Sequence, residues 1–294
     1  MAPHGHHNIA WEISNDERFS QEVGSIDDLL TELADLPYDV ILSSEDFECS
    51  AHHSEQFSLF VERLKRCRFD VKFIVYFRNQ IEYAESLYLT MLLFELNTPY
   101  RKYIDEILES GKFCWRSWIF PFDYDEFLTR LRSIDGVELV VRSYDALEKG
   151  ALVSNFLSIL GLHSNGPDII ERIWLNERCS TTETVAAFYR NCVRRPLLAS
   201  EQVALASLFR SAGSRVEMND QSKLDLIEKF DDSNRRLFIA YGIPEFEYMR
   251  PKRIRTESSK GMSMEDIFSS GLRDAVEEMI GSTNARNSTS NEPR

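Results

Sequence analysis

The sequence predicts an α/β fold in which a short parallel sheet is flanked by helices and followed by a helical carboxyl half. Unbroken runs of β-branched and aromatic residues at 72–77 and 137–142 are typical of strands buried on both faces. Between these runs, apolar residues recur at helical spacing, which is the arrangement that a right-handed parallel crossover needs. Beyond residue 150 the pattern is helical only.

The first elements are predicted as a helix over 27–36, a strand over 38–43, a helix over 53–66 and the strand over 72–77. Their helical spacing is carried by Leu29, Leu30 and Leu33 in the first helix, and by Phe57, Phe60, Val61 and Leu64 in the second. With the strand at 137–142, this gives an expected sheet of three parallel strands.

A long helix is expected from about Ile81 to a break before Pro99, and a second from Pro99 to Ser110, because proline ends or starts helices. A further helix is predicted over 124–132. The helices predicted for the carboxyl half are 151–160, 168–175, 181–193, 200–211 and 224–241.

Residues 1–250 are expected to form a single α/β domain. After Arg250 the composition changes to Ser, Asn, Gly and Glu. Residues 251–294 are therefore predicted to be a mostly disordered tail, with one weak helix over about 264–279 and disorder from Gly281 onward.

Composition limits the functions that the chain can have. Its 294 residues are 43% hydrophobic, which allows a substantial core, and its formal charge of −14 argues against non-specific nucleic-acid binding. Any anionic ligand must be met by local arginines. The five cysteines have no C-x-x-C spacing, so we expect reduced thiols and no metal site.

No charged amino-terminal region precedes an apolar stretch, so no signal peptide is predicted. The longest apolar run, around Leu87 to Leu96, is shorter than the roughly 20 residues that cross a bilayer. We therefore expect a cytoplasmic location and no membrane span.

The segment Lys72 to Leu89 carries the clearest functional signal. Arg78 ends the predicted strand, and the following helix carries Ser86. A guanidinium and a hydroxyl at the carboxyl end of a parallel strand can bind a phosphate group. The alternative is that Arg78 pairs with Glu82 or Glu85 and that Ser86 is an ordinary helix-surface residue.

This segment resembles the second nucleotide-binding motif of the sulfotransferases, in which an Arg and a Ser eight positions later hold the 3′-phosphate of 3′-phosphoadenosine 5′-phosphosulfate (PAPS). The chain is also similar to the bacterial carbohydrate-type branch of that family, and the resemblance spans roughly residues 11–242. The segments that carry it are 40–45, 139–145, 155–162, 176–180 and 233–238. It implies a P-loop-like fold related to the NTP hydrolases, with PAPS as co-substrate.

The chain departs from this family at its start. Family members open with a strand and a Gly-rich, lysine-containing loop that binds the 5′-phosphosulfate, but here Gly5 is the only glycine before Gly24 and the first lysine is Lys65. The first strand and the loop are thus expected to be missing, by truncation or by loss. A sheet without that strand would leave an apolar edge that a partner chain could cover.

The resemblance also implies roles for individual residues. Glu45, expected just after the strand at 38–43, is the predicted catalytic base; the alternatives are a solvated loop acid, or His52 and His53 as the base. Tyr144 is expected to stack on the adenine. Apart from the resemblance, Trp115 and Trp118 belong to a short aromatic cluster and are predicted to contact a sugar, with core packing as the alternative.

Three functions follow from these expectations. The first is transfer of a sulfuryl group from PAPS to a hydroxyl of a glycan or similar acceptor. The second is a catalytically inactive protein that binds a nucleotide or glycan. The third is an interaction protein whose apolar sheet edge is covered by a partner chain.

Overall fold

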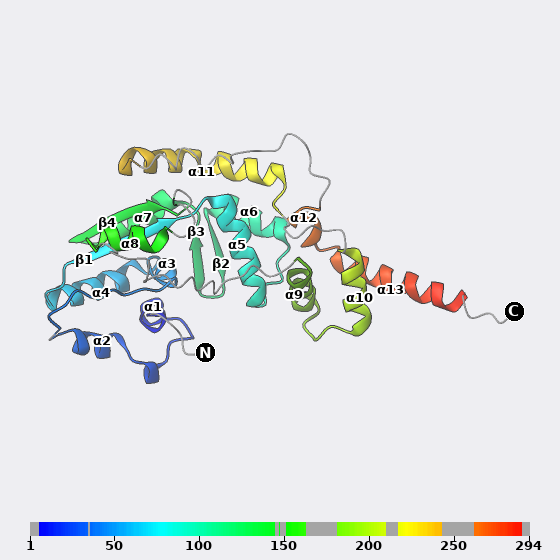
Figure 1. Cartoon of the computed structure of the whole chain (residues 1–294), viewed down its shortest axis with the longest axis horizontal. Coiled ribbons are helices and arrows are strands. Elements are labelled where there is room, and N and C mark those ends of the chain that lie inside the picture. The colour runs from blue at the N-terminus through cyan, green and yellow to red at the C-terminus, as the bar shows by residue number, and fades with distance from the viewer. Residues whose placement is uncertain are drawn as a thin grey trace. The chain divides into compact units, whose positions relative to one another are not determined.

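The computed structural model describes residues 6–34, 36–144, 147, 151–162, 181–209, 217–242 and 262–289 (Figure 1). The chain divides into two compact units. The first unit comprises residues 1–78, 106–146 and 229–250, and the second comprises residues 79–105, 147–228 and 251–294. The predicted helix over 168–175 and the segment 176–180 lie outside the described residues.

The first unit is built around a two-stranded parallel sheet of β1 (Val71–Phe77) and β4 (Val137–Ser143). The two strands pair in step, from Val71 opposite Val137 to Phe77 opposite Ser143. The sequence therefore predicted both strands correctly, and the mixed α/β character with a short parallel sheet between helices is confirmed.

One face of this sheet joins the hydrophobic core, whereas the other carries both partly buried and exposed residues, so the expectation of burial on both faces holds for only part of each strand. The residues facing the core are Val71, Phe73, Val75, Phe77, Val137, Leu139 and Val141. On the opposite face Lys72 and Glu138 are exposed and form an ion pair of 3.1 Å. Along each strand, residues that face the core therefore alternate with residues on the opposite face, some of which are charged and exposed.

Helices of the first unit cover the core face. They include α4 (Ser54–Arg66) and α7 (Tyr124–Arg132), whose apolar residues join the same cluster. Helix α7 begins where the Asp123 carboxylate accepts a hydrogen bond from the backbone N–H of Glu126, which is a typical N-cap. The remaining helices of the amino half are α1 (His7–Ser14), η1 (Gln21–Val23), α2 (Ile26–Leu33) and α3 (Phe47–Ser50).

The predicted strand over 38–43 is wrong, because the structure assigns no strand to these residues. The backbone of Ser43 instead bonds to His6: its N–H donates to Nδ1 at 3.1 Å, and its carbonyl accepts from the His6 N–H at 2.8 Å. Tyr38 is 72% exposed and Ile41 is 48% exposed. Without a sheet neighbour, these β-forming residues gain no packing that would hold them in a ladder.

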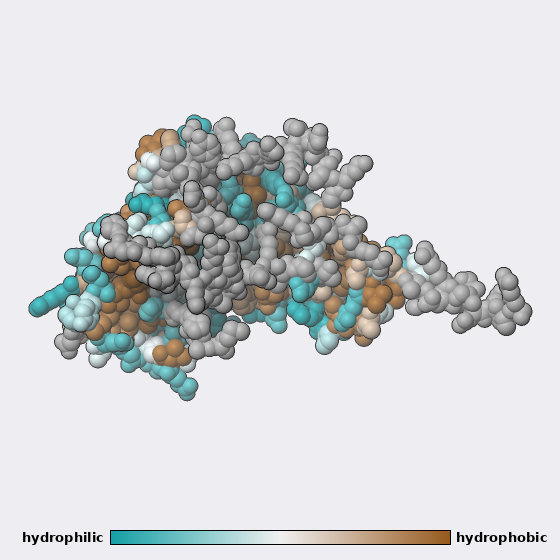
Figure 2. Space-filling view, in the orientation of Figure 1, coloured by the Kyte–Doolittle hydropathy of each residue, from teal (hydrophilic) through white to brown (hydrophobic). Residues whose placement is uncertain are grey.

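Apolar side chains are consequently exposed in the first unit. Figure 2 shows hydrophobic surface, coloured brown, in the region where Figure 1 places β1 and α4. The exposed apolar residues of the first unit between positions 36 and 60 are Leu36, Tyr38, Val40, Ile41 and Leu59.

The aromatic stretch after residue 110 forms a β-hairpin that the sequence analysis did not predict. Strands β2 (Lys112–Trp115) and β3 (Trp118–Pro121) pair antiparallel, with Trp115 opposite Trp118. Arg116 in the turn has a φ of 57°, the left-handed conformation that tight hairpin turns require.

The second unit is helical, and α6 and α11 contribute to both units. Its core includes Tyr88, Tyr100 and Tyr103, all fully buried. The Asn191 carboxamide donates to the carbonyls of Leu92 and Leu96, which lie at and just beyond the end of α5. The helices are α5 (Gln80–Leu93), α6 (Tyr100–Ser110), α8 (Leu152–Ile159), α9 (Thr181–Val193), α10 (Ala199–Leu208), α11 (Asp220–Tyr241), α12 (Met264–Ile267) and α13 (Leu272–Thr289).

Two further observations concern these helices. Helix α13 continues to Thr289, beyond Gly281, where disorder was expected to begin. Among the described residues, no helix combines the length and the apolar character that crossing a bilayer demands.

We predict that Gly136→Ala lowers the free energy of unfolding by about 1 to 2 kcal/mol, the cost of placing a Cβ in left-handed backbone. Gly136 has a φ of 68° in the turn before β4, and an added Cβ would meet the Lys65 side chain. Urea unfolding followed by circular dichroism measures the change. Gly281→Ala is the matched control: Gly281 lies within α13 with open space around it, so alanine should not destabilise the protein. An unchanged midpoint for Gly136→Ala would contradict the prediction.

Candidate functional site

The carboxyl edge of the β1–β4 sheet brings two of the predicted site residues together. Arg78 follows β1 and Tyr144 follows β4. The Tyr144 N–H donates to the Phe77 carbonyl at 2.7 Å, which extends the parallel ladder by one step. The Arg78 guanidinium carbon lies 5.5 Å from the centroid of the Tyr144 ring, within the range of a cation–π contact.

Tyr124 of α7 supports this edge from the core side. Its hydroxyl donates to the Arg78 carbonyl at 2.8 Å, and its ring stacks on Phe77 with the ring centroids 4.1 Å apart. Tyr124 is 2% exposed, whereas Tyr144 is 44% exposed. The hydrogen bond from Tyr124 therefore fixes the backbone at Arg78 from the core side of the sheet. The Tyr144 ring, in contrast, is accessible to a planar ligand.

Ser86 belongs to the second unit. Helix α5 begins at Gln80, where the Asn79 side chain accepts from the Ile81 N–H at 2.9 Å. At ~1.5 Å per residue, Ser86 lies about 9 Å along the helix from that start. Ser86 is half-buried, and its carbonyl accepts from the Thr90 hydroxyl.

Glu45 lies in a turn just before α3, and it is exposed. Its carbonyl accepts from the Glu48 N–H at 3.1 Å. The strand that was expected to deliver Glu45 to the sheet edge does not form, so the geometric argument for its catalytic role is lost. The role itself stays a prediction.

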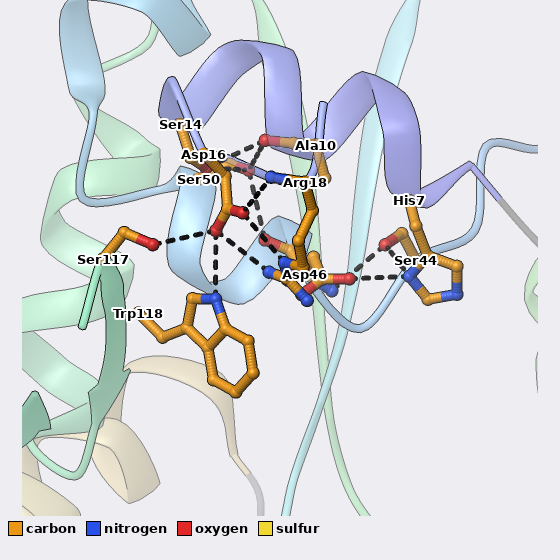
Figure 3. Close-up of polar contacts among 10 residues, drawn as sticks. All are labelled: His7, Ala10, Ser14, Asp16, Arg18, Ser44, Asp46, Ser50, Ser117 and Trp118. Carbon is orange, nitrogen blue, oxygen red and sulfur yellow. Dashed lines mark hydrogen bonds and ion pairs between the residues drawn. The ribbon is translucent and has the colours of Figure 1, made fainter. Parts of the chain in front are cut away.

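A network of buried and partly buried charges connects the amino-terminal segment to the hairpin (Figure 3). Arg18 donates from Nε to Asp16 at 2.8 Å and from Nη2 to Asp46 at 3.1 Å. Its guanidinium carbon lies 4.6 Å from the centroid of the Trp11 ring and 4.3 Å from that of the Trp118 ring. The Arg18 guanidinium is therefore in contact with two carboxylates and two indole rings. These contacts compensate the cost of removing the cation from water.

Asp16 is the most heavily bonded carboxylate of this network. Ser117 Oγ and the Trp118 indole N–H each donate to its Oδ2 at 3.0 Å, in addition to the bonds from Arg18. Burial alone would raise the pKa of Asp16, but the hydrogen bonds and the charge of Arg18 outweigh it and lower the pKa to about 2. Asp16 is therefore ionised at any physiological pH.

Asp46 extends the network to the first helix. His7 Nδ1 lies 2.7 Å from Asp46 Oδ2, and the Ser44 hydroxyl lies 2.9 Å from the same His7 nitrogen (Figure 3). Asp46 is the neighbour of the predicted base Glu45. Unlike Glu45, it is engaged in these internal contacts.

The two tryptophans predicted to contact a sugar differ in their surroundings. Trp118 is 7% exposed, its N–H is bonded to Asp16 and its ring lies against Arg18. Trp115 is half-buried, with the Arg116 guanidinium carbon 5.8 Å from its ring centroid. Within the described residues, the Trp115 indole N–H has no hydrogen-bond partner. Trp115 is thus the more exposed of the two residues, but its indole N–H is itself buried.

His52, the alternative base, lies between α3 and α4 with its ring 6.4 Å from that of Phe127. Desolvation, together with the positive charges of Arg130 and Lys112, lowers the pKa of His52 to about 4. Its Nε2 has no hydrogen-bond partner in the part of the chain that the structure describes. That nitrogen is buried, and a pKa of about 4 makes the imidazole a weak proton acceptor near neutral pH.

Sequence reasoning did not identify Asp16, Arg18 or Tyr124. Their roles depend on contacts between residues far apart in the sequence, such as the hydrogen bond from Trp118 to Asp16. Local residue spacing does not predict such contacts. In the described ranges no group of three or more His, Cys, Asp or Glu side chains could hold a metal ion. Comparison of the chain with protein-family models, with curated proteins and with solved structures finds no match.

We predict that Asp16→Asn lowers the free energy of unfolding by about 3 to 5 kcal/mol, because it leaves the Arg18 cation partly buried without its closest counter-charge. The native pKa of Asp16 lies below the unfolded value of 3.8, so its contribution is complete above that pH and is lost as the pH falls toward 2. Denaturant unfolding at several pH values measures both effects. Asp27→Asn, whose carboxylate is 79% exposed in its ion pair with Arg63, should change stability by less than about 1 kcal/mol. Equal effects of the two substitutions would refute the central role of Asp16.

We predict that the protein loses stability as the pH falls from 6.5 to about 4, in part through His52. In this interval the unfolded chain protonates His52 while the folded chain keeps it neutral, so unfolding is favoured by acid. His52→Gln should flatten the dependence of unfolding free energy on pH in this window. His53→Gln, the adjacent substitution, should leave it as in the parent chain. If both variants keep the parent's slope, the assignment to His52 is wrong.

Proposed function

We propose that the chain binds a 3′-phosphoadenosine nucleotide at the carboxyl edge of the β1–β4 sheet and transfers its sulfuryl group to a hydroxyl of a glycan or similar acceptor. The observation that carries the proposal is the meeting of Arg78 and Tyr144 at the ends of two neighbouring parallel strands. Ligands of open α/β sheets bind at this edge.

The chemistry of the two side chains suits a nucleotide. Arg78 offers planar N–H donors that match phosphate oxygens, and the exposed ring of Tyr144 offers a face for the adenine. The hydrogen bond from Tyr124 to the Arg78 carbonyl fixes the backbone before any ligand arrives. Preorganisation of this kind reduces the entropic cost of binding.

A local cation is needed because the chain as a whole carries a formal charge of −14. That net charge repels an anionic nucleotide. Dissolved salt screens this repulsion at separations greater than about 10 Å. The attraction must therefore come from groups in direct contact with the phosphate, and Arg78 is one such group. The predicted contribution of Ser86 rests on its spacing in the sequence.

In the proposed reaction the acceptor oxygen forms a bond to sulfur while the bond from sulfur to the bridging phosphate oxygen breaks. The acceptor proton passes to a base, for which Glu45 remains the proposed residue. The leaving group is adenosine 3′,5′-bisphosphate. Arg78 would hold the 3′-phosphate and so position the nucleotide for in-line transfer.

A second candidate is nucleotide binding without transfer. The position of Glu45 favours it, because no strand carries this residue to the sheet edge and it lies in an exposed turn. Incubation with PAPS labelled in its sulfuryl group separates the two candidates: label appearing in a glycan acceptor supports transfer, whereas binding with no label transferred supports the second candidate.

We predict that Arg78→Ala weakens binding of adenosine 3′,5′-bisphosphate by about 2 to 3 kcal/mol, the scale of charge-assisted hydrogen bonds. Isothermal titration calorimetry measures the affinity. Arg66→Ala, which removes an arginine that is 72% exposed on α4, is the matched control and should leave the affinity unchanged. No binding by the parent chain, or equal affinity of the parent and Arg78→Ala, would overturn the proposed site.

A further inference from the structure

The outer edge of β4 faces away from β1, and no other strand among the described residues pairs with it. The bond from the Tyr144 N–H to the Phe77 carbonyl fixes the alternation along the ladder. In a parallel pair, a residue directs both its N–H and its C=O to the same neighbour, and the next residue directs both the other way. Val140 and Arg142 therefore bond to β1, and Leu139 and Val141 present their backbone groups to the outer edge.

A side-chain contact agrees with this assignment. Arg142 donates from Nη1 to the carbonyl of Val141 at 2.8 Å, so a side chain of β4 itself caps an outward carbonyl. Arg142 is exposed, and the Glu138 side chain on the same sheet face is 62% exposed. The outer edge of β4 thus has backbone groups that are not paired with another described strand, and it carries the cation Arg142 and the anion Glu138.

The charges on β4 are placed symmetrically about Val140, with Glu138 two residues before it and Arg142 two residues after. If two copies of β4 run antiparallel about a two-fold axis at Val140, Glu138 of each lies opposite Arg142 of the other. In the same register, Leu139 lies opposite Val141 of the partner subunit. These are the residues whose backbone groups point outward, and such a pair exchanges both of its hydrogen bonds.

We propose that a second copy of this chain binds at the outer edge of β4, which joins the two sheets in the order β1-β4-β4-β1. The interface is isologous, as a two-fold axis requires. Backbone hydrogen bonds supply most of the affinity, as in other cases of strand addition. The exposed charge pairs contribute little energy but select the register, because a shift by one residue removes both pairs.

The outer edge of β1 is a poorer candidate for the same pairing. By the same alternation, its outward residues include Lys72, Ile74 and Tyr76. Antiparallel self-pairing about Ile74 would place Lys72 opposite Tyr76 of the partner subunit, with no opposite charge to meet it. Lys72 already pairs with Glu138 within the chain, and the second carboxylate oxygen of Glu138 can accept from the partner's Arg142.

Sedimentation equilibrium on the full chain, from about 1 to about 500 μM, tests the proposal. The parent should show a concentration-dependent dimer. Arg142→Glu places carboxylates opposite each other and should raise the dimer dissociation constant at least about tenfold. Combining Glu138→Arg with Arg142→Glu exchanges the charges and should restore the parent constant. Arg66→Glu makes the same charge change on α4 and should have no effect. A monomeric parent, or a double variant no better than Arg142→Glu, would overturn the proposal.

Amide hydrogen exchange gives an independent readout that does not depend on any substitution. The N–H groups of Val140 and Arg142 should be protected at all concentrations, since they bond to β1. Those of Leu139 and Val141 should become protected only as the dimer forms. Protection of Leu139 and Val141 that is independent of concentration would mean that another part of the chain covers the edge, and no protection at all would mean an open edge. Either result contradicts the proposal.

Discussion

The parallel pairing of β1 with β4 is the constraint on which the first unit depends. It sets Phe77 opposite Ser143, and so the residues that follow, Arg78 and Tyr144, emerge at the same edge. It also decides which backbone groups of β4 remain on the outside. The candidate ligand site and the proposed dimer interface are therefore two consequences of one register, one at the end of the strands and one along their side.

A second constraint is the Arg18 cation between two indoles and two carboxylates. It ties the amino-terminal helix α1, the loop that carries Asp16, the start of α3 and the β2–β3 hairpin into one assembly. A partly buried ion pair of this kind is weak evidence for net stability, because desolvation opposes the Coulomb attraction. What the contacts show is position: the Trp118 ring lies against Arg18 and its N–H donates to Asp16, which holds the hairpin against the amino-terminal segment.

The sequence predicts best those elements whose own run of apolar residues is enough to determine whether they form a strand or a helix. The apolar runs of β1 and β4 and the amphipathic helices α7 and α9 were predicted almost to the residue. The segment 38–43 has the same β-rich composition but no sheet neighbour, and so it remains outside the ladder. The hairpin turn is formed by Arg116 and Ser117, so it lacks the Asn-Gly or Asp-Gly pair by which a sequence predicts two-residue hairpins. At the site, sequence spacing selected Arg78 and Tyr144, whereas the roles of Arg18 and Tyr124 depend on residues far away in the chain.

The most direct test of the account is a titration of the isotope-labelled protein with adenosine 3′,5′-bisphosphate, followed by nuclear magnetic resonance. The shared edge of β1 and β4 predicts that the Arg78 Nε–Hε signal and the Tyr144 ring signals shift together, with one dissociation constant. Binding that moves neither signal, or that moves one without the other, would contradict the claim that the parallel register builds a nucleotide site from these two residues.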